Sequence, residues 1–151
     1  MSGGLFPEAE LATRVGTPFP GGEVRLDRWW VHLALDSIGA EPDDGPGHPA
    51  LVFLIATGAM GWSWTELFEV FDAKEEDGPM AGETATTVRT PLRIGSTYRV
   101  SGEIVSARRK TGRSVGVFDI VEYRLELIGD DDMVHASTTN SIIFPRRSAT
   151  E

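Results

Sequence analysis

Residues 50–71 read ALVFLIATGAMGWSWTELFEVF, the most continuously apolar stretch of the chain and the one from which its fold can be predicted. Its first part is apolar on nearly all sides, and the pattern becomes amphipathic after Trp62, which predicts one long helix or an extended lead followed by a helix. The apolar run from Ala50 to Gly61 is about a dozen residues, short of the roughly 20 that span a bilayer. We therefore predict a core helix that other elements must surround.

The chain that follows supplies those surrounding elements. Four segments are rich in Val, Ile, Thr, Tyr and Phe and alternate in places with charged residues, as strands do: 83–92, 97–108, 113–127 and 133–144. Polar turns that contain glycine separate them at 110–112 and 129–132, which favours antiparallel hairpins. The sequence thus predicts an α+β fold in which a curved antiparallel meander wraps one long central helix.

The part of the chain before residue 50 reads as lead-in structure. A loop with several Gly and Pro residues over 15–22 precedes a short strand over 23–26, and a helix follows that begins near Trp29 and ends at Gly39. Residues 41–49 hold three prolines and two glycines and predict a loop. We expect a single domain over 1–151, with 1–14 as a flexible N-terminal segment.

Composition excludes several classes of function. The net charge is -9 with a pI near 4.8, which repels nucleic acid. There are no cysteines, so disulfides and thiol catalysis are excluded. Three histidines leave little for metal binding, and we expect neither a metal nor a cofactor. The first residues lack the pattern of a signal peptide, so a cytoplasmic protein is the expectation.

Four segments in order carry a resemblance to a known family. They are Val15-Gly-Thr-Pro-Phe19, Leu35-Asp-Ser-Ile-Gly39, Ile55-Ala-Thr-Gly58, and Gly82-Glu83 with Arg89-Thr-Pro-Leu-Arg-Ile-Gly95. With these, the stretch from residue 15 to 147 resembles the MaoC-like dehydratases, whose fold is the hotdog: a long helix held by a curved antiparallel sheet. The resemblance is greatest to the N-terminal halves and small subunits of (R)-specific hydroxyacyl dehydratases.

The resemblance implies an acyl thioester, carried by coenzyme A or acyl carrier protein, as substrate or ligand. Such enzymes add or remove water across the double bond next to the thioester, with an Asp and a His as acid and base and a backbone N–H polarising the carbonyl. It places Gly58 at the start of the central helix as the carbonyl-binding glycine, with Thr57 and Gly82 as further substrate-binding residues. An exposed sheet edge predicts a homodimer or a heterodimer with another hotdog subunit.

Two alignments of the family's Asp-x-Asn-Pro-x-His motif compete. If Gly39 is the glycine that precedes the motif, Ala40 replaces the catalytic Asp and no His follows at the right distance, so the chain would be a non-catalytic partner. If the loop slides, Asp43 and His48 become the catalytic pair, with Gly in place of Asn. The second alignment requires an insertion before the motif and a shortening after it, and we prefer the first.

Other functions stay open from the sequence. Hotdog thioesterases use a carboxylate on the central helix, and Glu66 and Glu69 are available there, although both fit a solvent-facing helix surface. His32 and His135 are expected to be partly buried structural residues. The basic cluster Arg108-Arg-Lys110 with Arg113 predicts a solvated hairpin tip or, alternatively, contacts to the phosphates of coenzyme A or to an acidic carrier protein.

Overall fold

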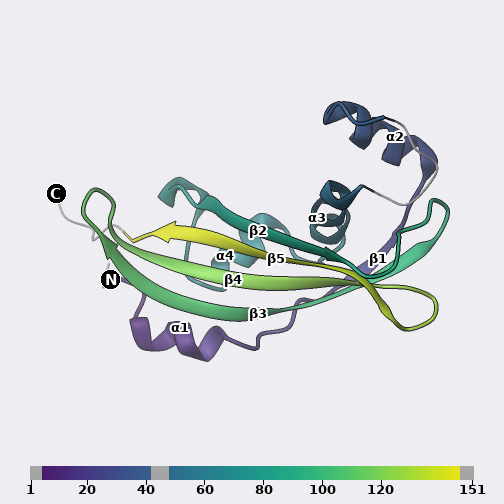
Figure 1. Ribbon diagram of the computed structural model, residues 1–151. Coiled ribbons are helices and arrows are strands. Elements are labelled where there is room, and N and C mark those ends of the chain that lie inside the picture. The colour runs from purple at the N-terminus through teal and green to yellow at the C-terminus, as the bar shows by residue number, and fades with distance from the viewer. Residues whose placement is uncertain (1–4, 42–47, 147–151) are drawn as a thin grey trace.

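The structure is a computed structural model that describes residues 5–41 and 48–146. Its centre is one antiparallel sheet of five strands in the order β1-β3-β4-β5-β2, strongly curved along its length (Figure 1). The strands are β1 (Gly22–Arg25), β2 (Met80–Val88), β3 (Thr97–Gly112), β4 (Gly116–Ile128) and β5 (Val134–Pro145). The predicted α+β class and the antiparallel sheet are confirmed.

The order of the strands differs from the predicted meander in one respect. Strands β3, β4 and β5 follow one another as expected, but β2 pairs with β5 at the far edge and β1 pairs with β3. The segment after β2 turns away from the sheet at Thr90-Pro91, after the N–H groups of Arg89 and Thr90 have both donated to the carbonyl oxygen of His135. The outer edge of β2 is therefore left without a strand partner among the described residues.

Burial alternates along the central strands, as it does when one face of a sheet is covered. In β4 the odd-numbered side chains from Asp119 to Leu127 are buried, and in β5 the even-numbered ones from Ala136 to Phe144 are buried. These residues form the inner face, against which the helices pack. The outer face carries charged pairs such as Arg124 with Glu103.

The central helix is broken into two, which corrects the prediction of one long helix. Helix α3 (Pro49–Gly58) ends before α4 (Trp64–Glu69) begins. Gly61 has a φ of +87°, and a Cβ atom there would lie 2.6 Å from the backbone oxygen of Gly21, so only glycine fits. Ser63 and Glu66 then form a capping box that starts α4.

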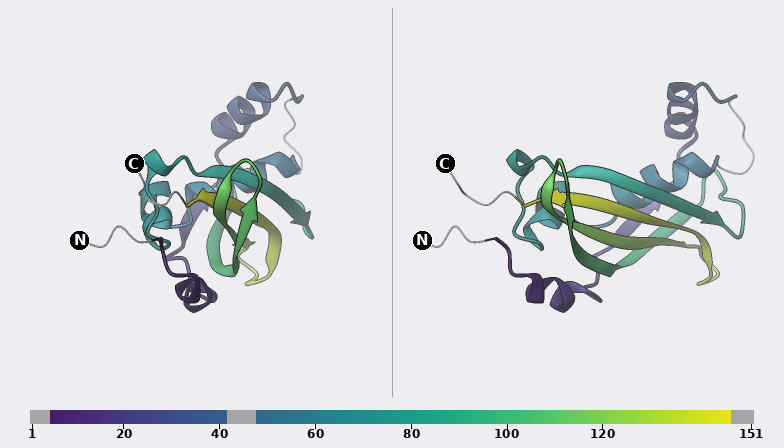
Figure 2. Two further views of the ribbon diagram at one scale, coloured as in Figure 1. Left: turned by 90° about the vertical axis from the view of Figure 1, so that its left-hand side faces the viewer. Right: turned by 60° about the vertical axis from the view of Figure 1, so that its left-hand side comes forward.

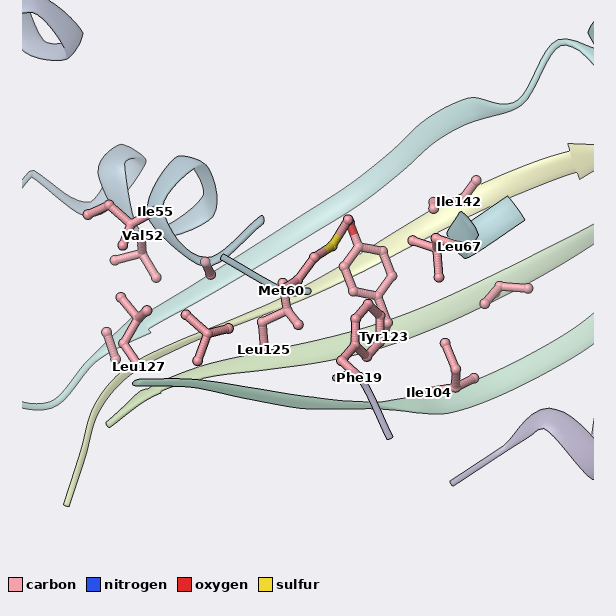
Figure 3. Close-up of a cluster of buried hydrophobic side chains, with 14 of the residues drawn as sticks. Phe19, Val52, Ile55, Met60, Leu67, Ile104, Tyr123, Leu125, Leu127 and Ile142 are labelled. Carbon is pink, nitrogen blue, oxygen red and sulfur yellow. The ribbon is translucent and has the colours of Figure 1, made fainter. Parts of the chain in front are cut away.

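The loop before β1 crosses this break and holds it in place. The Gly21 N–H donates to the Met60 carbonyl oxygen at 2.9 Å, and the ring of Phe19 packs on Trp62 with centroids 4.7 Å apart. Figure 3 shows Phe19 and Met60 beside Tyr123 in the apolar core that joins both helices to the sheet. The two short helices together thus take the place predicted for one.

The remaining helices lie outside this core. Helix α2 (Arg28–Ser37) stands off the sheet beyond α3 (Figures 1 and 2), and its Trp29 side chain is 65% exposed. Helix α1 (Glu8–Arg14) packs beside β3 with Leu11 buried. Residues 1–14, predicted to be a flexible segment, therefore include a docked helix. One turn of 3-10 helix, Glu75–Asp77, precedes β2.

A buried ion network joins distant parts of the chain at one end of the sheet. The Asp119 carboxylate, which is fully buried, accepts hydrogen bonds from Arg109 at 2.8 and 3.0 Å and from Arg146 at 2.7 Å. Arg109 also donates to the Phe6 carbonyl oxygen, and Arg146 donates to that of Phe71. The network therefore links the N-terminal segment, the end of α4 and the last strand.

Candidate functional site

A mainly apolar hollow lies between the two helices and the inner face of the sheet. Its volume is about 240 Å³. Helix α3 contributes Phe53, helix α4 contributes Trp64 and Phe68, and the strands contribute the other lining residues, which are Pro79, Met80, Ala81, Thr84, Tyr123, Asn140, Ser141 and Ile142. We call this hollow the helix–sheet pocket. Apolar walls with a small number of polar groups are typical of a ligand pocket.

Three polar side chains of the pocket form a row across the sheet. Thr84 of β2 pairs in register with Asn140 of β5, and Asn140 pairs with Tyr123 of β4. Residues directly opposite each other on neighbouring strands have Cβ atoms about 4.5–5.5 Å apart. The row therefore places an amide between two hydroxyl groups on one wall of an otherwise apolar pocket.

This row was not predicted from the sequence. The sequence held one signal for it. Asn140 lies on the same face of β5 as Ile142 and Phe144, so a polar side chain interrupts the buried face of the strand. Burial raises the pKa of Tyr123, because an ionised phenolate is poorly solvated inside the protein. Tyr123 is therefore a neutral phenol throughout the physiological pH range.

The two residues of the proposed catalytic pair are placed differently. His48 is the N-cap of α3, and its Nδ1 accepts a hydrogen bond from the Ala50 N–H at 3.1 Å. The other member, Asp43, lies outside the described residues. Ala40, which replaces the acid in the preferred alignment, is half-buried and packs against the apolar core.

Gly58 does not occupy the position expected of it. It is the last residue of α3 and not the first of the central helix. The positive end of the α3 dipole is therefore at Pro49 and Ala50, and the helix-terminus argument for a carbonyl site does not apply to Gly58. Thr57 is close by, and its hydroxyl donates to the Phe53 carbonyl oxygen at 2.7 Å, within the same helix.

Gly82 lies at a bulge in β2. The register shifts between Ala81 and Thr84, and the Ser141 hydroxyl accepts a hydrogen bond from the Glu83 N–H at 2.7 Å. A Cβ atom on Gly82 would collide with that hydroxyl oxygen. The two residues at the ends of the shift, Ala81 and Thr84, line the helix–sheet pocket, so Gly82 shapes one of its walls.

The carboxylates considered for thioester hydrolysis lie outside the helix–sheet pocket. Glu66 accepts a hydrogen bond from the Ser63 N–H at 2.7 Å in the capping box, and Glu69 is exposed. The lining residues that fall within 5–41 and 48–146 include no carboxylate and no imidazole. In the same ranges, no three His, Asp or Glu side chains gather in a way that could hold a metal ion.

A second hollow, lined mainly by polar residues, lies at the turn between β4 and β5. His135 Nε2 is 2.9 Å from Asp131 Oδ1 there, and the His135 side chain is largely buried, as expected for a structural histidine. The pKa of Asp131 is lowered, mainly because it accepts a hydrogen bond from the Met133 N–H and then by His135. We assign this pair to the stability of the turn.

Comparison with known proteins rests on structure. No known family pattern matches the sequence, and no curated protein is similar to it. The ChsH1–ChsH2 complex from Mycobacterium tuberculosis matches at a TM-score of 0.70 and 13% identity, over 94% of this chain and 97% of that one. A truncated HadBC (3R-hydroxyacyl-ACP dehydratase) complex from the same organism matches at 0.67 and 14% identity, over 86% and 96%.

A third similar structure is the MaoC-like dehydratase from Rhodospirillum rubrum, with a TM-score of 0.58 and 15% identity over 88% of this chain and 93% of that one. These matches establish that the chain has the hotdog fold of the MaoC-like dehydratases, as the sequence resemblance implied. No described helix is both long and apolar enough to cross a bilayer.

Proposed function

We propose that this protein binds an acyl thioester of coenzyme A or acyl carrier protein, as the substrate-binding subunit of a MaoC-like enoyl hydratase or 3-hydroxyacyl dehydratase. One observation carries the proposal: a hotdog fold encloses an apolar pocket between α3, α4 and the sheet, and its described lining residues hold no acid–base pair. Binding without chemistry is what such a pocket supports, because hydration requires a group that moves a proton.

The competing alignment remains a hypothesis in which Asp43 and His48 are the catalytic pair. His48 would have to release its cap on α3 to act as a base, because its Nδ1 already accepts the Ala50 N–H. In either case Thr57, Gly58 and Gly82 are proposed to contribute to substrate binding, the last by shaping the wall of the pocket beside Thr84.

A partner subunit is the second part of the proposal. The unpaired outer edge of β2 offers a row of backbone N–H and C=O groups. Met80 of β2 is 47% exposed, and the helices expose Leu54 at 42% and Trp64 at 41%. Two of the similar structures are complexes, HadBC and ChsH1–ChsH2. We propose that β2 pairs with the edge strand of a second hotdog chain, of the same or a different kind.

Hydration of crotonyl-CoA by the purified chain tests the catalytic assignment. The expected result is binding of the thioester with little turnover, and turnover at least a hundredfold higher when a hotdog chain with an intact Asp-x-Asn-Pro-x-His motif is added. Robust turnover by the chain alone that both D43A and H48A abolish would overturn the preferred alignment and make these residues catalytic.

The oligomeric state tests the partner assignment. Light scattering at micromolar concentration is expected to give a mass above that of the 16.4 kDa monomer, or to do so once a partner chain is added. Replacing Thr86 of β2 with proline is expected to prevent association, because proline cannot donate to a ladder and the N–H of Thr86 faces the outer edge, on the side opposite to the Arg89 N–H that donates to β5. A monomer under every condition would contradict this part of the proposal.

A further inference from the structure

The row of polar side chains in the helix–sheet pocket contains a buried amide with unused donors. Asn140 is 3% exposed. Its Oδ1 accepts the Thr138 hydroxyl at 3.0 Å, and its Nδ2 has no hydrogen-bond partner among the described residues. With the Thr138 hydroxyl donating to Oδ1, the Nδ2 group lies on the other side of the amide. The N–H donors are thus free on the other side.

Tyr123 is the register partner of Asn140, and it is 1% exposed. Its ring stands up from β4 toward the helices and contacts the Phe19 ring, with centroids 5.5 Å apart (Figure 3). Its hydroxyl is not one of the buried side-chain atoms that lack a hydrogen-bond partner among the described residues, so the buried unpaired group of the row is Asn140 Nδ2. A buried phenol that stays neutral is a hydrogen-bond donor, so two donors from adjacent strands line the same pocket.

Leaving the Asn140 Nδ2 group unpaired is costly in a folded protein, because buried polar groups are nearly always satisfied by protein or water. A ligand that supplies an acceptor oxygen would remove the cost. None of the lining residues in the described part of the chain carries a positive charge, so a neutral acceptor suits the site better than a carboxylate. The walls are apolar and include Phe53, Phe68 and Ile142, which suits a short hydrocarbon chain.

We propose that Asn140 Nδ2 and the Tyr123 hydroxyl donate two hydrogen bonds to the carbonyl oxygen of an acyl thioester, whose hydrocarbon part lies against the aromatic walls of the helix–sheet pocket. Two donors that converge on one carbonyl oxygen polarise it. The site would therefore hold the thioester carbonyl through side chains of the sheet and not through a backbone N–H at a helix terminus. This inference deepens the proposed function and rests on it.

The test combines affinity with infrared spectroscopy of crotonyl-CoA labelled with ¹³C at the thioester carbonyl. Titration of the full chain gives the affinity, and the difference spectrum gives the C=O stretch of the bound ligand. Compared variants are N140L, Y123F and the control T139V, which changes a polar residue on the opposite face of the same strand. Circular dichroism establishes that each is folded, and Y123F, which keeps the ring, provides the test if N140L does not fold.

The expected result is about tenfold weaker binding for N140L and for Y123F, as for the loss of one hydrogen bond. The bound carbonyl stretch should move to higher frequency in both, while T139V matches the unchanged protein. Crotonyl-CoA that binds all variants with equal affinity and an unchanged stretch would overturn this inference and leave the proposed function standing. Absence of binding to the unchanged protein at millimolar ligand would overturn the proposed function itself.

Discussion

Two buried polar clusters on the inner face of the sheet differ in how completely their hydrogen bonds are satisfied. Around Asp119, both carboxylate oxygens accept from guanidinium groups, and the remaining N–H groups of Arg146 reach backbone carbonyl oxygens of residues 71 and 72. In the helix–sheet pocket, the Asn140 Nδ2 has no protein partner among the described residues. Each cluster includes a side chain of β4, Asp119 in one and Tyr123 in the other, yet only one of them is complete.

The difference in hydrogen bonding indicates that one cluster stabilises the fold and the other is available to bind a ligand. A complete network holds several segments together, and removing one member exposes the others to an uncompensated burial cost. The Asp119 network therefore stabilises the fold. An incomplete cluster beside a cavity contributes little to stability and is available to a ligand. We assign the two clusters these different roles, which predict different losses of stability when each cluster is mutated.

The largest effect is expected for D119N. This substitution keeps the shape of the side chain but leaves Arg109 and Arg146, 14% and 6% exposed, without their buried counter-charge. The free energy of unfolding should fall by about 3–5 kcal/mol. Urea denaturation measures it. The control is E122Q on the outer face of β4, where the exposed pair with Arg108 should cost less than about 1 kcal/mol. Equal losses in the two variants would contradict the structural role of Asp119.

A smaller effect is expected from Y123F at alkaline pH. The pKa of Tyr123 is raised in the folded protein by burial, whereas in the unfolded chain it ionises near pH 10. Below pH 10 the phenol is protonated in both states, and its titration leaves the free energy of unfolding unchanged. Above pH 10 only the unfolded chain loses the proton readily, so the free energy of unfolding falls as the pH rises. The unchanged protein should therefore lose up to about 1.4 kcal/mol per pH unit from this group above pH 10, and Y123F should lack that part. Identical alkaline profiles would contradict the burial of the hydroxyl.

The smallest change in stability is expected for the double variant N140L/T138V. Both members of the Thr138–Asn140 hydrogen bond become apolar side chains of similar size, and the unpaired Nδ2 is removed. Such replacements are nearly neutral or stabilising, so urea denaturation should give a change within about 1 kcal/mol. A loss as large as that of D119N would make the row a structural element and would remove the contrast between the two clusters.

Strand positions were predictable because burial on one face imposes a period of two, which the sequence displays directly. The inner face of β4, with Val121, Leu125 and Leu127, follows from that pattern alone. The break in the central helix was not predicted, although its signals were present in Gly61 and in the Ser63–Glu66 spacing. The continuous apolar pattern favours an unbroken helix. The break depends on the close approach of Gly21 to Gly61, a contact between segments far apart in the chain.

The role of Arg109 also depends on a contact that the local sequence does not predict. Its neighbours Arg108 and Lys110 are basic and exposed. From the sequence, the basic cluster predicts a solvated hairpin tip or a contact to phosphates. The structure turns Arg109 alone toward Asp119, and its pKa is raised, mainly by that hydrogen bond. The alternating direction of side chains on β3 separates it from its neighbours, but its partner ten residues away is set by the register of the hairpin with β4.

The class of the fold, the antiparallel strands, the central apolar segment and the resemblance to the MaoC-like dehydratases could all be predicted from the sequence, because they depend on local periodicity and on motifs that are contiguous in the chain. The pairing of β2, the position of the break in the central helix and the polar groups that meet in the helix–sheet pocket depend on contacts between distant segments and required the folded structure. Thr84, Asn140 and Tyr123 become neighbours through strand register. Register depends on hydrogen bonds between segments that are distant in sequence, and no local pattern specifies it.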